Sequence, residues 1–306
     1  MTSHDVVNRL RKLYQTRRVG HTGTLDPDAT GVLVVCLGYA TRLAEYLSSS
    51  EKAYHTEIQL GIETDTQDAS GVTTSLCDAS HITETQLREA CKPFTGTIKQ
   101  VPPMVSALHH EGKRLYDLAR EGITVEREAR EITINHLELL HFAPQEHPVA
   151  TFEVVCSTGT YIRTLAADIG ASLAVGGMMS RLRRLWVGKS DHAFTLSEAY
   201  TLESLQALAE EGRLAESALS VASALRGWQL IPLSEEETLR LCQGQSVPLP
   251  SFPETEKGYS ALSGESALVG VLNPQGEAFA LARLSETQLQ PVKVLFSCDG
   301  RRNEES

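Results

Sequence analysis

The stretch GHTGTLDPDATG, residues 20–31, is followed directly by the apolar run VLVVCLG, residues 32–38. Glycine, proline and short polar side chains together predict a tight loop, and the apolar run predicts a buried strand after it. Pro27 biases Asp26 toward extended geometry. The loop would therefore hold one carboxylate rigidly at the mouth of a strand, as a nucleophile or a base requires. Spacing alone favours a simpler alternative, in which the loop is a structural Asx turn or a helix cap.

Helix and strand patterns are mixed along the rest of the chain. Helices are expected over residues 3–13, 40–48, 83–92, 115–120, 161–173 and 197–225. Strands are expected over residues 54–60, 149–156, 267–272, 278–284 and 292–296. Apolar residues recur at helical spacing in 3–13, where Thr2 or Ser3 can act as the cap, whereas 54–60 alternates like a strand. These patterns predict an α/β (α+β) protein with a small β-rich domain at its C-terminal end.

Charge is distributed unevenly over the 306 residues. The net charge of −11 argues against a nucleic-acid partner if it is taken as uniform. Residues 1–50, 92–130 and 151–192 are nevertheless each net +2, whereas residues 193–306 carry 8 basic and 16 acidic groups, net −8. The three basic blocks leave a polyanion partner open, although a solvated helix face explains the first of them equally simply. A hydrophobic fraction of 41% excludes a disordered chain.

Several classes of protein are disfavoured by missing patterns. The six cysteines show neither C-x-x-C spacing nor a zinc-like Cys/His cluster, and scattered cysteines suit a reducing compartment. The sequence lacks both G-x-x-x-x-G-K-[ST] and G-x-G-x-x-G, which disfavours nucleotide binding. No apolar signal-peptide core is present, and Val32–Leu37, the longest apolar run, is too short to span a membrane. We therefore expect a soluble, cytoplasmic protein.

The stretch GHTGTLDPDATGVL resembles the signature of the TruB family of tRNA pseudouridine synthases. The flanking segments SHDVVNRLR, EKAY, LGIETDTQDASG, QVPPMVSAL, GKRLYDLAREG and GTYIRTLAADIG follow in the order of that family and extend the resemblance over residues 2–190. The C-terminal part is similar to the PUA-like RNA-binding domain of the family. The resemblance implies a pseudouridine synthase fold with a large mixed, mostly antiparallel sheet. It implies a catalytic domain over 1–228, a PUA-like domain over 229–298 and a tail over 299–306.

The same resemblance implies an activity, namely isomerisation of uridine-55 in the TΨC loop of tRNA to pseudouridine. Asp26 matches the nucleophile of the family, which attacks either C6 of the uracil or C1′ of the ribose. Arg163 matches the arginine that pairs with this aspartate, and its charge is expected to favour the ionised carboxylate. Tyr54 matches the tyrosine that stacks on the target base and helps remove the C5 proton. The implied partner is tRNA, with no membrane and no obligate protein partner. No metal or organic cofactor is implied, since the nucleophile is a side chain and no redox step occurs.

Further residues match the substrate-binding positions of the family. His21 matches the histidine that helps extrude the nucleotide, and Tyr161 and Leu182 match residues around the uracil. Residues 102–130 resemble an RNA-gripping insertion that is mobile without RNA. Phosphate contacts are expected from five basic residues, namely Lys113, Arg114, Arg181, Arg183 and Arg184. Without the resemblance, His21 would be interpreted as a surface histidine, Tyr54 as a strand aromatic and Leu182 as a core leucine.

The chain departs from the pattern of the family in two places. The family begins with a strand that carries a Lys-Pro pair, about twenty residues absent before Met1, so Met1 is expected to be internal to a longer frame or the chain truncated. Val105 and His109 stand where the family has Tyr and Lys. Two other functions are left open. One is a non-catalytic module that binds or folds tRNA, and the other is a synthase of the same fold that acts on another RNA, as guide-RNA-dependent relatives do.

Overall fold

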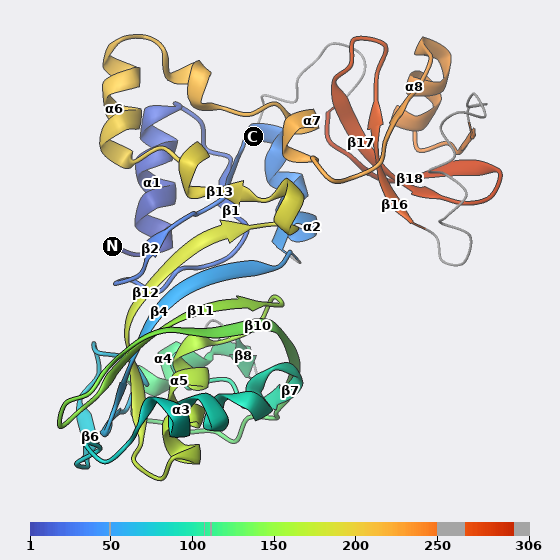
Figure 1. The fold of residues 1–306 in the computed structure, drawn as a ribbon. Coiled ribbons are helices and arrows are strands. Elements are labelled where there is room, and N and C mark those ends of the chain that lie inside the picture. Colours follow the sequence, from blue (N-terminus) through green and yellow to red (C-terminus); the bar gives the residue numbers. More distant parts are fainter. Residues whose placement is uncertain (49, 107, 111, 250–266, 297–306) are drawn as a thin grey trace.

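The computed structural model describes residues 1–48, 50–106, 108–110, 112–249 and 267–296. Its main feature is a seven-stranded sheet in the order β13-β12-β4-β11-β10-β7, with β2 joined to β12 (Figure 1). The strands are β2 (Thr30–Gly31), β4 (Lys52–Leu60), β7 (Gly96–Gln100), β10 (Arg130–Ala143), β11 (Val149–Cys156), β12 (Gly177–Val187) and β13 (Phe194–Thr195). Every pairing is antiparallel except that of β2 with β12, which is parallel. This sheet confirms the expected large mixed, mostly antiparallel architecture.

The main core lies between this sheet and two helices, α3 (Glu84–Cys91) and α5 (Ile162–Ser172), which cover one face (Figure 1). Alternate residues of β11 are buried, as the period of a strand with one covered face requires. Phe152 from β11 and Leu165 from α5 are both fully buried in this core. A Cβ atom on Gly170 would lie 2.2 Å from the backbone of Gly176, so α5 and the start of β12 are in close backbone contact. This packing holds α5 against the covered face of the sheet.

The N-terminal elements form a smaller layer. α1 (Ser3–Leu13) begins at a capping box in which the Thr2 and Asp5 side chains bind each other's backbone amides. It packs on the two-stranded sheet of β1 (Val19–His21) and β3 (Val35–Leu37), and on α6 (Leu202–Glu210). The expected buried strand over residues 32–37 is therefore wrong in extent. Only its last three residues are β-strand, and only Val32 and Cys36 of the run are buried, because β3 belongs to this two-stranded ribbon and not to the main sheet.

The C-terminal region forms its own five-stranded sheet, in the order β14-β16-β17-β18-β15. Its elements are β14 (Leu230–Pro232), α8 (Glu235–Cys242), β15 (Val247–Pro248), β16 (Leu268–Leu272), β17 (Ala278–Leu284) and β18 (Gln288–Val294). The expected β-rich C-terminal unit is present. Leu281 and Leu295 pack on Leu43, Leu47 and Leu225 of the preceding region, so an apolar cluster joins the two parts. The segment 297–306, which includes the expected tail, lies outside the described residues.

Shorter elements connect these layers. They are α2 (Ala44–Ser48), β5 (Ile62–Thr64), β6 (Thr73–Leu76), β8 (His109–His110), β9 (Lys113–Arg114), α4 (Leu115–Arg120) and α7 (Val221–Ala224). The helix expected near 115–120 is present as α4, and Leu115 and Leu118 anchor it. The helix expected over 197–225 is wrong in continuity, since the chain there breaks into α6, a short 3₁₀ turn and α7. Gly212, which follows α6 with a φ of +72°, marks the first break.

Candidate active site

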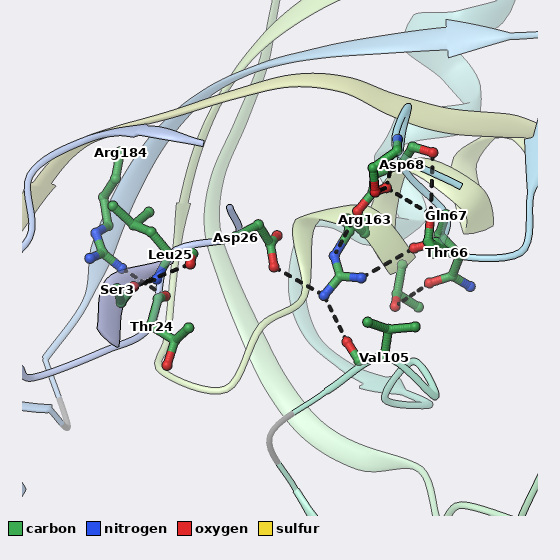
Figure 2. Close-up of polar contacts among 12 residues, drawn as sticks. Ser3, Thr24, Leu25, Asp26, Thr66, Gln67, Asp68, Val105, Arg163 and Arg184 are labelled. Atoms are coloured by element: carbon green, nitrogen blue, oxygen red, sulfur yellow. Dashed lines mark hydrogen bonds and ion pairs between the residues drawn. The ribbon is translucent and has the colours of Figure 1, made fainter. Parts of the chain in front are cut away.

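Asp26 lies in the loop between β1 and β3, and its carboxylate points toward the first turn of α5 (Figure 2). The loop is held at Leu25 by Ser3 of α1. The Ser3 hydroxyl accepts from the Leu25 amide at 2.9 Å and donates to the Leu25 carbonyl at 3.2 Å. Directly after Asp26, the Ala29 amide donates to the Asp26 carbonyl at 3.0 Å, which closes a turn. Of the three loop glycines, only Gly31 adopts a positive φ, +112°. The loop expected from the sequence is therefore present, and long-range as well as local hydrogen bonds hold it.

Arg163, in the first turn of α5, is the partner of the Asp26 carboxylate. Its Nη2 donates to Asp26 Oδ1 at 3.1 Å, and its side chain is only 6% exposed. The same guanidinium donates to the carbonyls of Val105 (2.9 Å) and Thr66 (3.2 Å) (Figure 2). The structure thus brings together two residues that are 137 positions apart in the chain and that the sequence proposed as a pair. The Val105 contact also ties the start of the 102–130 segment to this cation.

A second carboxylate, Asp68, shares Arg163 with Asp26, and sequence reasoning missed it. Asp68 Oδ2 lies 3.6 Å from Arg163 Nε, with its side chain 14% exposed. Its other carboxylate oxygen accepts from the Thr66 hydroxyl at 2.7 Å and from the Ser70 amide at 3.0 Å, so the loop after β5 is folded around it. The run TDTQDASG, with four Asp or Thr turn formers, is the signal that marks this loop in the sequence.

The pKa of Asp26 is raised above its ordinary value of 3.8, because burial of the carboxyl outweighs the opposing charge of Arg163. Asp68 raises this pKa further through its negative charge. The Asp26–Arg163 contact agrees with the sequence expectation, which made no prediction of the net direction of the shift. The expected effect of Arg163 on the ionised form is real, and it is the smaller of the two effects here. Pairing two carboxylates with one buried cation makes this a site of perturbed acidity, as functional sites often are.

Tyr54 lies near the start of β4 with its ring packed into the main core, 7% exposed. Burial raises the pKa of Tyr54 to about 12, and the positive charge of Arg184 only partly opposes this shift. A phenol with this pKa stays protonated at neutral pH. Cross-strand pairing places Tyr54 between Val154 of β11 and Arg184 of β12, so its position is set by the sheet register.

Arg184 does not have the environment expected of a phosphate contact, and that assignment is wrong. Its side chain is buried, 1% exposed. Its guanidinium donates to the backbone carbonyls of Val32 (2.7 Å), Gly23 (3.1 Å) and Thr24 (3.4 Å). The reason is the strand period, because Arg184 shares a face of β12 with the buried Leu182, two residues before it.

The other arginines of β12 point to solvent, as the same period requires. Arg183 is exposed, and Arg181 is 79% exposed with a weak 3.6 Å ion pair to Glu57. Lys113 in β9 is also exposed and pairs with Glu121 at 3.5 Å. The backbone of Arg114 is part of β9, but its side chain lies outside the described residues. These exposed cations stay candidates for RNA contact.

The two residues expected around the uracil come from neighbouring elements. Leu182 is buried in the main core, 8% exposed, and Tyr161 is half-buried at the N-terminal end of α5. Gln100 fixes the Tyr161 backbone, accepting from its amide at 2.8 Å and donating to its carbonyl at 3.1 Å. Sequence reasoning missed Gln100, since nothing local distinguishes a buried strand amide from an exposed one.

His21, expected to help extrude the nucleotide, ends β1 and is half-buried. Burial lowers its pKa, and the charge of Arg184 adds to that effect, so the neutral imidazole is favoured. Among the described residues, its buried Nδ1 has no hydrogen-bond partner.

A cavity of about 770 Å³ lies on the other side of the Asp26 loop. Its lining comes from α1, from residues 25–37 and from residues 194–205 and 217–224, and it is mainly apolar. Asp26 borders it, but Tyr54, Tyr161, Arg163 and Leu182 do not, so it is distinct from the polar cluster around Arg163. Within the described residues, no group of three or more His, Cys, Asp or Glu side chains could hold a metal ion. No helix in the described part of the chain is long and apolar enough to cross a membrane.

Comparison with known protein families identifies two matching sequence models. Residues 11–162 match the N-terminal domain of the TruB family pseudouridylate synthases. Residues 163–226 match the C-terminal domain of tRNA pseudouridylate synthase B. Asp26, Tyr54, Asp68 and Tyr161 fall within the first match, which ends one residue before Arg163. Arg163, Leu182 and Arg184 fall within the second.

Two relatives illustrate the similarity. The tRNA pseudouridine synthase B of Symbiobacterium thermophilum is 49% identical over 244 residues, covering 80% of this chain and 78% of the relative. That of Moorella thermoacetica is 42% identical over 307 residues, covering 96% and 95%. Among solved structures, a Cbf5-Nop10-Gar1 complex contains a chain with a TM-score of 0.68 and 23% identity, covering 98% of this chain and 83% of the other. An H/ACA RNP bound to a substrate RNA contains one with a TM-score of 0.66 and 22% identity, covering 100% and 84%. At this identity the two structures support the fold alone.

Proposed function

The chain belongs to the TruB family of pseudouridylate synthases, and from that premise we propose that it converts uridine-55 in the TΨC loop of tRNA to pseudouridine. The family makes it an isomerase whose reaction class is pseudouridylation of tRNA. Position 55, the residue roles and the domain boundaries are our inference. The observation that supports them most is the Asp26 carboxylate held 3.1 Å from the buried Arg163 guanidinium, at a loop fixed on both sides of Asp26.

Asp26 acts as the nucleophile in this proposal. Its ionised carboxylate attacks either C6 of the uracil or C1′ of the ribose, and the N1–C1′ bond breaks. The base then turns over, C5 bonds to C1′, the C5 proton leaves, N1 is protonated and the carboxylate is released, so the reaction is an isomerisation with no net redox change. Arg163 favours the ionised form of Asp26 and opposes the effect of burial. The overall reaction, as proposed, needs no cofactor and no metal.

Other residues surround the target base in the proposal. We assign the ring of Tyr54 to stacking on the target base and to the floor of the site. We do not assign its hydroxyl as the base that removes the C5 proton, because a pKa of about 12 keeps it protonated at neutral pH. Tyr161 and Leu182 line the pocket, and His21 helps hold the nucleotide out of the stem-loop stack. The exposed cations Lys113, Arg181 and Arg183, with Arg114, contact phosphates and orient the stem-loop.

The two structural units have separate roles in this proposal. Residues 1–228 form the catalytic domain, with 102–130 as the segment that grips RNA, and 229–298 form a PUA-like RNA-binding domain. The C-terminal region is acidic, so we expect it to contribute less to binding than the basic blocks of the catalytic domain. A tRNA substrate would place the activity in the cytoplasm.

The test is replacement of Asp26 by Ala, with an unmodified tRNA transcript as substrate. We expect loss of pseudouridine formation with tRNA affinity changed less than about threefold, since one partly exposed carboxylate contributes little to phosphate binding. Asp28→Ala, two residues on and exposed, is the matched control and should retain product. Turnover by Asp26→Ala near the wild-type rate would refute the nucleophile assignment.

The same assay separates the rival functions. Tight tRNA binding by the wild-type chain without any product would favour a tRNA-binding or tRNA-folding module. An isolated TΨC stem-loop that is modified without any guide RNA supports the proposed substrate. Failure on the stem-loop and on whole tRNA, with activity on another RNA, would favour a synthase with a different substrate.

A further inference from the structure

The backbone around Asp26 is held at both ends by one side chain, that of Arg184. On the N-terminal side of Asp26, its two terminal nitrogens donate to the carbonyls of Gly23 (3.1 Å) and Thr24 (3.4 Å). On the C-terminal side, its Nε donates to the carbonyl of Val32 (2.7 Å). The guanidinium therefore closes the loop 24–32, with Asp26 inside it.

The main chain of Arg184 takes part in the same closure. Its carbonyl accepts from the Val32 amide at 2.9 Å, and β12 pairs in parallel with β2 at Gly31. Gly31 is required for that approach, because a Cβ atom there would lie 2.1 Å from the Arg184 carbonyl oxygen. Arg184 thus binds Val32 through both its backbone and its side chain, which fixes the direction in which the loop leaves the sheet.

Arginine is the residue type that this geometry needs. A planar guanidinium offers several donors in a fixed fork, so one side chain can reach acceptors in two separate segments. A lysine ammonium at the end of a flexible stem can reach one side of the loop but cannot span both. At 1% exposure the side chain has no surface to offer a phosphate, so its charge serves the protein's own backbone.

We propose that Arg184 is a positioning residue for the reaction, which holds the Asp26 loop closed and so aims the Asp26 carboxylate at the target nucleotide. This inference rests on the proposed function for its catalytic part. Its structural part, that one guanidinium keeps the loop closed, stands independently. Arg184 acts through the backbone of Gly23, Thr24 and Val32 and does not touch the reacting atoms.

The first test is hydrogen exchange in the free protein, which needs no activity. In Arg184→Lys, the amides of residues 22–33 should exchange about tenfold or more faster than in wild type, because hydrogen bonds from a charged donor are lost. Amides of β17 in the distant sheet should be unchanged. Arg183→Lys, on the exposed face of the same strand, is the matched control and should leave loop exchange as in wild type. Unchanged loop exchange in Arg184→Lys overturns the proposal.

The second test is single-turnover pseudouridine formation with saturating enzyme. Arg184→Lys should lose about 10²-fold in rate, as misplacement of a reacting group by roughly an ångström does, with tRNA affinity within about threefold of wild type. Weaker tRNA binding at an unchanged single-turnover rate would instead show a phosphate contact and would overturn the proposal. If the wild-type chain forms no pseudouridine, the proposed function fails, whereas the exchange result still decides whether Arg184 closes the loop.

The pH dependence of that rate separates positioning from loss of folded protein. Charged groups face Asp26 from three elements, Arg163 on α5, Asp68 after β5 and Arg184 on β12. The titratable Tyr54 of β4 also interacts with Asp26 and Arg184 and is neutral at neutral pH. The charge of Arg184 lowers the pKa of Asp26. Arg184→Met should therefore lower the rate and move its acid limb to higher pH, whereas Arg184→Lys should lower the rate with a smaller move. A variant that is only partly unfolded would form less pseudouridine in total, with the single-turnover rate and the acid limb of its pH profile unchanged. That result would overturn the proposal. If Arg184→Met does not fold, Arg184→Lys, which keeps the buried charge, carries both tests.

Discussion

Replacement of Arg163 by Met should raise the pKa of the Asp26 carboxyl. The guanidinium lies 3.1 Å from Asp26 Oδ1 and 3.6 Å from Asp68 Oδ2, with side-chain exposures of 6%, 30% and 14% for the three residues. Two unit charges at 3.1 Å attract by about 5 kcal/mol at an effective dielectric constant of 20, which is a ceiling for this pair. An adjacent arginine lowers a carboxyl pKa by about 1–3 units in practice, or about 1.4–4 kcal/mol.

The direction of the shift follows from these signs. The pKa of Asp26 is already above 3.8, because burial exceeds the effect of Arg163. Without Arg163, only burial and the negative charge of Asp68 remain dominant, so the pKa of Asp26 should rise by about a further 1–3 units. A nucleophilic carboxylate must be ionised, so the acid limb of the reaction should move to higher pH by the same amount. Arg163→Lys keeps the charge and should move the limb less.

Two measurements check this prediction. One is the pH profile of single-turnover tritium release from tRNA that carries 5-³H uridine, since C5 loses its hydrogen when pseudouridine forms. The other is a ¹³C NMR titration of the Asp carboxyl signals, with Asp26→Asn for assignment, which does not depend on activity. Arg88→Met, which breaks an exposed Arg88–Glu84 pair on α3, is the control and should leave both unchanged. An Asp26 titration that stays at its wild-type position in Arg163→Met would refute the electrostatic reasoning.

The same substitution should reduce stability in a pH-dependent way. Removing Arg163 leaves two poorly exposed carboxylates without a cation, which should cost about 3 kcal/mol in the free energy of unfolding at neutral pH. A raised folded-state pKa contributes stability that is present at low pH and is lost as pH rises through it. The deficit relative to wild type should therefore shrink as the pH falls, and urea unfolding at two pH values measures it.

Three further outcomes are expected. Gly31→Ala should lower the free energy of unfolding by about 3 kcal/mol, because its Cβ atom would lie 2.1 Å from a backbone oxygen, whereas Gly122→Ala, with positive φ but open space, should cost about 1 kcal/mol in urea unfolding. Burial lowers the pKa of Lys52 from 10.5 to about 8, so wild-type stability should rise with pH across that window relative to Lys52→Met, by at most about 3 kcal/mol. Affinity for tRNA should fall steeply with salt, and Arg181→Ala and Arg183→Ala should each reduce the slope of log K against log salt by about one, a change whose absence would exclude phosphate contact.

Much of the local structure could be predicted from short-range patterns. The helix over 3–13 and the strand over 149–156 have the predicted bounds, because a capping residue and a regular apolar period act within a few positions. The run 32–37 was harder to predict, since an apolar strand of the main sheet and one of a small ribbon have the same composition. Pattern alone also joined 197–225 into one helix that the structure breaks after residue 210.

The sequence pointed to the central pair of the candidate site but not to its other members or its electrostatics. The loop and its signature pointed to Asp26 and Arg163, and the structure places them in contact. Asp68 was missed, since a carboxylate in a turn-rich loop is normally a local cap. The net direction of the Asp26 pKa could not be predicted, because the balance between an opposite charge and burial depends on how deeply the carboxyl lies.

Sequence by itself determined the family, the local elements and the identity of the central carboxylate, all of which follow from residue types at short or ordered spacing. Only the tertiary structure decided that Arg184 faces inward to close the Asp26 loop while Arg183, its neighbour, faces solvent. It also brought Asp26, Asp68 and Arg163 together from three distant segments. The physical reason is that burial and long-range pairing depend on which face of a strand is covered, and the covering elements are far away in the chain.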